Sequence, residues 1–132
     1  MLSYGIGART VEGEGPACNL FSTTGDYMDP FIENEEELIN SYIGTIKSVK
    51  LALPIYFREI IKIVCDLAEN EYFKAADLKE IKNYYILTIL MAGCIDDVEE
   101  TFNEILRASQ LPVSVVVIKI GTHSEENDSK KI

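Results

Sequence analysis

Tyr84-Tyr-Ile-Leu-Thr-Ile-Leu-Met91 decides the fold class, because these eight residues contain almost no polar side chain. A run of this length, rich in β-branched and aromatic residues, favours a strand that is covered on both faces. A second run of the same kind, Val113-Ser-Val-Val-Val-Ile-Lys-Ile120, follows a break at Pro112. Two such strands predict a mostly parallel sheet between layers of helices.

The segment between these two runs has the pattern of a helix. Asp97 is suited to cap it, and Glu100 follows three positions later. Its apolar positions are Val98, Phe102, Ile105 and Leu106. Strand, helix and strand together predict a βαβ unit with a right-handed crossover, and therefore an α/β fold.

Two further helices are expected upstream of this unit. Asn34 and Glu37 have the spacing of a capping box for the first helix. Its predicted apolar face consists of Leu38, Ile39, Tyr42, Ile43, Ile46 and Val49. Pro54 is suited to open the second helix, followed by a connector over residues 69–82. The predicted buried stripe of the second helix consists of Ile60, Ile61, Val64, Cys65, Leu67 and Ala68.

The two ends of the chain differ in character. Tyr4–Ala8 and Ala17–Phe21 read as short strands that pair as an antiparallel hairpin, and a loop over residues 22–30 follows. From Thr122 onward the residues are polar and charged, which predicts a disordered tail. The expected organisation is one domain over residues 1–121 and a tail over residues 122–132.

Composition excludes several classes of partner. The net charge of −10 argues against nucleic acid and against direct contact with an anionic membrane. No apolar run is long enough to insert into a bilayer, and residues 1–9 lack the pattern of a signal peptide. Three widely spaced cysteines suit a reducing compartment. We therefore expect a cytoplasmic protein whose partners are proteins.

Five stretches, in the same order along the chain, resemble the A domain of the copine family. The strongest are Asn83-Tyr-Tyr-Ile-Leu-Thr-Ile-Leu-Met-Ala-Gly93 with Ile95-Asp-Asp-Val-Glu-Glu-Thr101, and Ala108-Ser-Gln-Leu-Pro-Val-Ser-Val-Val-Val-Ile-Lys-Ile-Gly121. Tyr4-Gly-Ile-Gly-Ala-Arg9, Asn19-Leu20 and Leu51–Ile61 are similar to the family's earlier segments. The resemblance covers roughly residues 4–121. It implies a partial, Rossmann-like sheet of the von Willebrand factor A type, flanked by helices.

The resemblance also implies a place for a divalent cation, and this sequence departs from the family there. Many domains of this type hold a Mg²⁺-type ion with oxygen ligands from three loops. Where copines have a threonine this chain has Ile55, and where they have an aspartate it has Ala92. The loop after the first central strand would lie before Met1. We therefore expect a degenerate metal site and no cofactor.

The missing central strand would leave unpaired backbone groups between Tyr4–Ala8 and Tyr84–Met91. Three outcomes are open: direct pairing of the two neighbours, a strand supplied by a second chain, or a chain that is part of a longer product. Direct pairing or a homodimer is favoured.

Other readings of individual residues carry less weight. Gly5 and Gly7 lack the third glycine of a nucleotide loop, so strand glycines that admit close backbone approach are preferred. Cys65 and Cys94 have one histidine to act with, His123 in the polar tail, so inert thiols are preferred. The acidic clusters at residues 33–37 and 125–128 are typical of solvated surface.

The expected function is a non-enzymatic protein-interaction module that works without metal and has no catalytic residues. Arg9, Asp96 and Asp97 are the candidates for interaction. The resemblance implies a place in a system of calcium-dependent phospholipid binding, with membrane association through other domains or partners. The alternative is a metal-dependent binding domain with other ligands, for instance Asp96, Asp97 or Asp26. An enzyme is disfavoured because no triad, oxyanion motif or phosphate loop is found.

Overall fold

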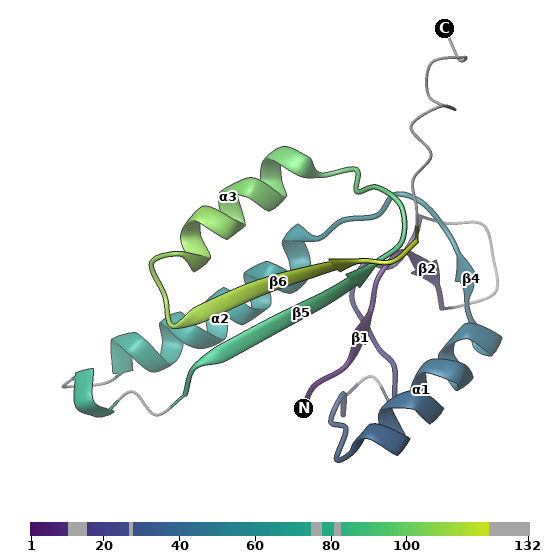
Figure 1. Ribbon diagram of the computed structural model, residues 1–132, viewed down its shortest axis with the longest axis horizontal. Helices are drawn as coiled ribbons and strands as arrows, with labels where there is room; N and C mark the ends of the chain where they lie inside the picture. Colours follow the sequence, from purple (N-terminus) through teal and green to yellow (C-terminus); the bar gives the residue numbers. More distant parts are fainter. Residues whose placement is uncertain (11–15, 27, 75–77, 81–82, 122–132) are drawn as a thin grey trace, which may run out of the picture.

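The computed structural model describes residues 1–10, 16–26, 28–74, 78–80 and 83–121, and these form a mixed α/β structure (Figure 1). The helices in these ranges are α1 (Glu35–Ser48), α2 (Arg58–Lys74), α3 (Val98–Ala108) and the short 3₁₀ helix η1 (Leu78–Glu80). The strands are β1 (Tyr4–Gly5), β2 (Ala8–Arg9), β3 (Phe21–Ser22), β4 (Lys50–Leu51), β5 (Tyr85–Met91) and β6 (Val113–Lys119).

β5 and β6 form the longest ladder of the molecule. They pair in parallel, from Tyr85 opposite Val113 to Met91 opposite Lys119, and α3 connects them. The predicted strand–helix–strand unit is therefore confirmed. The strand bounds agree with the prediction to within one residue, because β-branched residues suit a pleated ladder.

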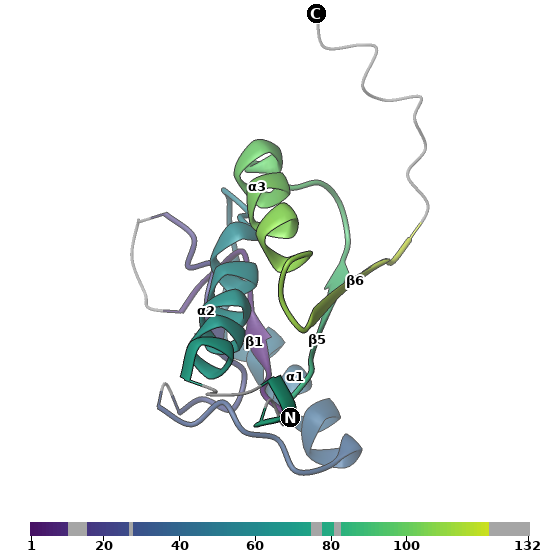
Figure 2. The same ribbon diagram turned by 90° about the vertical axis from the view of Figure 1, so that its left-hand side faces the viewer.

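The core lies on one face of this strand pair. Figure 2 shows α2 and α3 on the same side of β5 and β6. Buried residues of α2 meet Ile89 of β5, Val113 of β6 and Ala108 of α3. The other face is open, since Ile86 is 70% and Leu90 65% exposed. The prediction that both strands are covered on both faces is thus wrong for the described residues, because both helices pack on one side.

The first fifty residues form two small antiparallel pairs. β1 pairs with β3, an isolated bridge joins Ala8 to Cys18, and β2 pairs with β4. The predicted hairpin between the two N-terminal segments is confirmed, although its strands are shorter than expected. Gly7, with φ of 76°, turns the chain between β1 and β2, so that β2 reaches β4.

The expected single sheet does not form among the described residues. Their strands make three separate two-stranded sheets, and β1 pairs with β3 rather than with β5. Direct pairing of the Tyr4–Ala8 segment with β5 is therefore wrong for this structure. The edge of β5 away from β6 has no strand beside it in the described ranges.

Helix α1 begins where the sequence predicts. Asn34 Oδ1 accepts a hydrogen bond from the Glu37 N–H at 2.9 Å, as a capping side chain does. The Glu37 carboxylate in turn accepts from the Glu33 N–H at 2.8 Å. The predicted apolar face is present, but none of the residues of α1 is buried.

Helix α2 begins at Arg58, four residues later than Pro54, and continues to Lys74, beyond the point where a connector was expected. The segment 54–57 is not helical because its backbone groups bond to distant side chains, described below. Ile60, Ile61, Cys65 and Ala68 are buried, as predicted for this helix, whereas Leu67 is exposed.

Helix α3 turns an unexpected side toward its neighbours. Its buried residues are Thr101 and Ala108. The apolar positions that the sequence indicated are all exposed: Val98, Phe102, Ile105 and Leu106. No helix in the described part of the chain is long and apolar enough to span a membrane.

Candidate functional site

Three segments meet beyond the carboxyl end of β5, and we call this place the loop junction. They are Asn19 before β3, residues 53–57 before α2, and residues 92–97 between β5 and α3. In open α/β sheets ligands bind beside the carboxyl ends of strands. The loop junction is therefore the candidate functional site.

Asp96 binds the segment before α2 through both its side chain and its backbone. Its Oδ2 accepts from the Ile55 N–H at 2.7 Å, and its own N–H donates to the Ile55 carbonyl at 2.9 Å. One residue thus satisfies both backbone groups of Ile55. This pair of bonds fixes the loop after β5 against the segment that leads into α2.

Asp97 caps a helix other than the predicted one. Its Oδ1 accepts from the Phe57 N–H at 3.0 Å, and its Oδ2 from the Arg58 N–H at 2.9 Å. The side chain makes no capping hydrogen bond to α3, although the Asp97 carbonyl accepts from Thr101 N–H. Asp97 is 2% exposed, so its charge is placed at the N-terminus of α2, where the helix dipole favours it.

Asn19 completes the junction from the N-terminal side. Its Oδ1 accepts from the Tyr56 N–H at 3.0 Å, and its Nδ2 donates to the Pro54 carbonyl at 3.1 Å. The side chain is buried. Its role was missed from the sequence, where Asn19 was noted only as part of a family resemblance. Nothing in the local pattern identifies a contact with residues 35 and 37 positions away.

Two apolar side chains, Ile55 and Ala92, occupy the positions where the family resemblance implies cation ligands. The Ile55 side chain packs against the core beside Gly7, where an added Cβ would lie 3.0 Å from Ile55 Cγ1. Ala92 presents an exposed methyl group. Gly93 has φ of 102°, a conformation that favours glycine, so the turn after β5 is kept.

The oxygen donors present do not fit a resident Mg²⁺-type ion. Both oxygens of Asp97 and one of Asp96 already accept backbone N–H bonds. Asp26 uses its Oδ1 to accept from Met28 N–H in the loop before α1. Within the described ranges, no three His, Cys, Asp or Glu side chains are grouped so that they could hold an ion.

The other residues considered in the sequence either lie outside the loop junction or make no contact there that indicates a ligand. Arg9 is in β2, opposite Lys50 of β4. Gly5 lies in β1 under the Phe21 ring, which an added Cβ would strike, so the close approach at this strand glycine is made by a side chain and not by backbone as predicted. Burial raises the pKa of the Cys65 thiol, which makes it a poor nucleophile, and Cys94 is exposed. His123 lies outside the described residues.

A cluster of ion pairs joins α2 to α3 behind the sheet. The Arg107 guanidinium donates to Asp66 at 2.6 Å, to Glu69 at 2.6 Å and to Glu104 at 3.2 Å. Lys62 and Arg107 hold the pKa of Asp66 below its usual range, and Arg107 does the same for Glu69. All the charges of this cluster are satisfied within the chain, so it is a structural joint.

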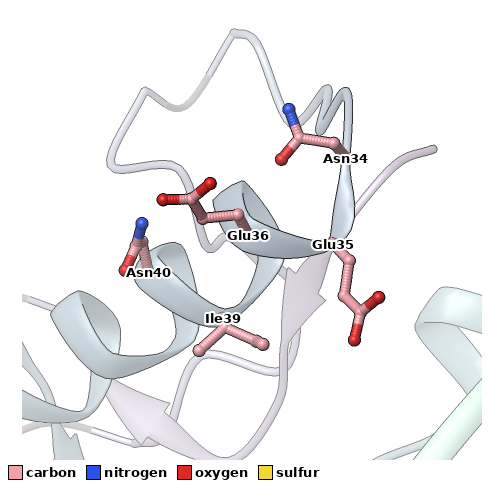
Figure 3. Close-up of a pocket in the computed structure, with 5 residues that line it drawn as sticks. All are labelled: Asn34, Glu35, Glu36, Ile39 and Asn40. Atoms are coloured by element: carbon pink, nitrogen blue, oxygen red, sulfur yellow. The ribbon is translucent and has the colours of Figure 1, made fainter.

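A shallow pocket of about 480 Å³ lies at the first turn of α1 (Figure 3). Asn34, Glu35, Glu36, Ile39 and Asn40 line it. Residues 33–37 are all exposed, which confirms the interpretation of this cluster as solvated surface. The second acidic cluster, at residues 125–128, lies outside the described residues.

Comparison with known proteins identifies relatives along nearly the whole chain. The family model described as Copine matches residues 1–130. The chain is 36% identical over 123 residues to Copine-E of Dictyostelium discoideum, covering 92% of this chain and 20% of that protein. It is 29% identical over 119 residues to Protein BONZAI 2 of Arabidopsis thaliana, covering 90% and 19%. The chain thus spans about a fifth of the length of these relatives.

Proposed function

The chain belongs to the copine family, and from this membership and the geometry of the loop junction we propose that it is a non-enzymatic protein-interaction module that works without a divalent cation. Its architecture is a partial domain of the von Willebrand factor A type with a degenerate metal site. The β5–α3–β6 unit and the meeting of loops at the carboxyl end of β5 support this assignment.

The observation that carries the metal-free function is the use of the two aspartates at the junction. Asp96 and Asp97 direct three carboxylate oxygens at the backbone N–H groups of residues 55, 57 and 58. Each of these oxygens already gives one lone pair to an N–H group, one of them the buried N–H of Phe57, so the two carboxylates are oriented toward the backbone and have less charge left for a cation. In this chain the aspartates hold the loops that a cation would otherwise bridge.

Proteins are the partners that the surface suits best. The net charge of −10 opposes nucleic acid and anionic lipid, while large apolar side chains of α1, α3, β5 and β6 are exposed. In a system of calcium-dependent phospholipid binding, we assign lipid contact to other domains or partners and target recruitment to this chain. The proposed location is the cytoplasm, with any attachment to the plasma membrane made through those partners.

Calorimetric titration with Mg²⁺, Mn²⁺ and Ca²⁺ tests the proposal. We expect no saturable heat at concentrations up to about millimolar, because Mg²⁺ and Ca²⁺ require several free oxygen donors. The Asp96→Asn variant serves as the matched control, since it removes one carboxylate and keeps the side-chain size. Saturable binding tighter than millimolar would overturn the metal-free function, and its loss in Asp96→Asn would assign the ion to Asp96.

A further inference from the structure

The outward face of β5 and β6 is uncovered and carries no charge. We call it the bare sheet face, and it consists of Ile86, Thr88, Leu90, Ser114, Val116 and Ile118. The ladder places these side chains in three cross-strand pairs, with Leu90 opposite Ile118 at one end. Figure 2 shows α2 and α3 on the opposite side of the strands. Parallel strands are stable when both faces are covered, so this face lacks a layer.

Helix α1 also has an uncovered apolar surface. We call it the helix stripe, and it consists of Ile39, Tyr42, Ile43 and Ile46. Their spacing of three and four residues places them on one side of the helix. Each is between 45% and 61% exposed. An amphipathic helix with no buried residue is stabilised little by its own chain, because most helix stability in proteins comes from packing.

We infer that two copies of this chain associate reciprocally, with the helix stripe of each copy packed on the bare sheet face of the other. A helix layer on each side of the sheet is the stable arrangement for an α/β fold. The helices α2 and α3 already share one side, and α1 is the remaining α-helix among the described residues. Because the stripe and the face are both exposed, α1 does not cover the face of its own chain.

The areas agree with this pairing. The helix stripe and the bare sheet face together expose on the order of 1,000 Å² per copy, so a reciprocal pair would bury about 2,000 Å², as homodimers do. A dimer with a single contact, one helix stripe on one bare sheet face, would bury about half of that area. The second helix stripe and the second bare sheet face would stay exposed.

Charge predicts how the pair responds to salt. Each copy carries a net charge of −10, so long-range repulsion opposes association. The side chains of the two surfaces are uncharged, so no ion pair across them is lost when salt is added. The dimer should therefore tighten as ionic strength rises, because salt screens the repulsion and leaves apolar contact intact.

Sedimentation of two double variants and their mixture tests the arrangement. Tyr42→Gln with Ile46→Gln removes the helix stripe, and Ile86→Thr with Val116→Thr removes the bare sheet face; all four positions are exposed. We expect each variant alone to dimerise at least about 100-fold more weakly, because every substitution acts twice in a symmetric pair. An equimolar mixture should regain dimer only in part, since the intact helix of one variant meets the intact sheet of the other while the second contact carries both changes.

Phe73→Gln is the matched control, because Phe73 is exposed at the end of α2 and belongs to neither surface. It should dimerise as the wild type does, and circular dichroism should show unchanged helix content for all variants. A wild-type chain that stays monomeric at high concentration and high salt overturns the inference. So does a dimer that the helix variant leaves intact, because that result indicates stacking of two bare sheet faces.

This inference rests on the proposed role as an interaction module and names one partner for it. The calorimetric titration and the sedimentation experiment test the two proposals independently. Metal binding in the calorimeter would remove the metal-free function and leave the dimer untouched. A monomer in the centrifuge would remove the second copy as partner and leave the metal-free function standing.

Discussion

Helices α1 and α2 have similar amphipathic patterns and opposite surroundings. Four residues of α2 are buried against β5 and α3, whereas α1 buries none. Both helices form where the sequence predicts apolar residues at helical spacing. A periodic apolar pattern therefore specifies a helix and its apolar face. It does not specify which element of the same molecule, or of a second molecule, packs against that face.

The N-termini of the same two helices differ in a parallel way. α1 is capped by Asn34, the residue directly before its first turn. α2 is capped by Asp97, which reaches it from 39 positions along the chain. The cap of α1 is a local contact, whereas the cap of α2 depends on the tertiary structure. Three experiments test this contrast between a helix that depends on local contacts and one that depends on tertiary contacts.

The largest difference should come from one isoleucine in each helix. Ile61 is 1% exposed in α2, and Ile61→Ala should lower the free energy of unfolding by about 3–4 kcal/mol through lost burial and a cavity. Ile43 is 45% exposed in α1, and Ile43→Ala should change the free energy of unfolding by less than about 0.5 kcal/mol. Urea denaturation at the lowest workable protein concentration, where association is minimal, measures both. Equal losses would mean that α1 is packed as tightly as α2.

The two caps should differ next. Asp97→Ala leaves the N–H groups of Phe57 and Arg58 without their acceptor and should cost about 2–3 kcal/mol. Asn34→Ala removes one exposed cap and should cost about 1 kcal/mol. Denaturant titrations of both variants make the comparison, with Asp97→Asn as a size-matched control that keeps one acceptor oxygen. A larger loss of unfolding free energy in Asn34→Ala than in Asp97→Ala would contradict this prediction.

The smallest effect concerns acid stability at the joint between α2 and α3. The pKa values of Asp66 and Glu69 are lowered in the folded protein, so the unfolded chain binds more protons as the pH falls. Their contribution to stability is present above about pH 5 and is lost below about pH 4. Arg107→Gln removes one bond to Asp66 and two to Glu69 and should flatten this pH dependence.

Denaturant unfolding at a series of pH values between about 3 and 6 measures that slope. Arg58→Gln is the matched control, because it removes a longer ion pair, 3.6 Å to Glu100, and leaves the cluster intact. Its slope should follow that of the wild type. Parallel curves for the wild type and Arg107→Gln would show that the cluster contributes nothing to acid stability.

Much of the secondary structure follows from short-range pattern, and the errors share one cause. The bounds of β5 and β6, the cap of α1 and the buried positions of α2 were predictable, because each depends on residues within a few positions. The start of α2 was not, since the segment after Pro54 bonds to Asn19, Asp96 and Asp97 instead of forming a helical turn. The buried side of α3 was also missed, because it depends on where α2 lies.

The candidate site divides in the same manner. The sequence pointed to Ile55, Ala92, Asp96 and Asp97 as the residues of interest, on family resemblance and on cap chemistry. The structure brings Ile55, Asp96 and Asp97 together at the loop junction and adds Asn19. It places Arg9 in β2, opposite Lys50. The absence of a metal ligand set remains a prediction until the titration is done.

The order of residues was enough to predict an α/β structure that resembles the copine family, with two apolar strands around a helix, and to propose Ile55 and Ala92 as replacements for cation ligands. Long-range contacts were needed to establish that Asp97 caps α2, that β1 pairs with β3 and not with β5, and that one face of the β5–β6 pair is exposed. Apolar periodicity and local caps act over a few residues, so a chain read in order contains them. Which helix meets which sheet face depends on contacts between residues dozens of positions apart, and these exist only once the chain has folded.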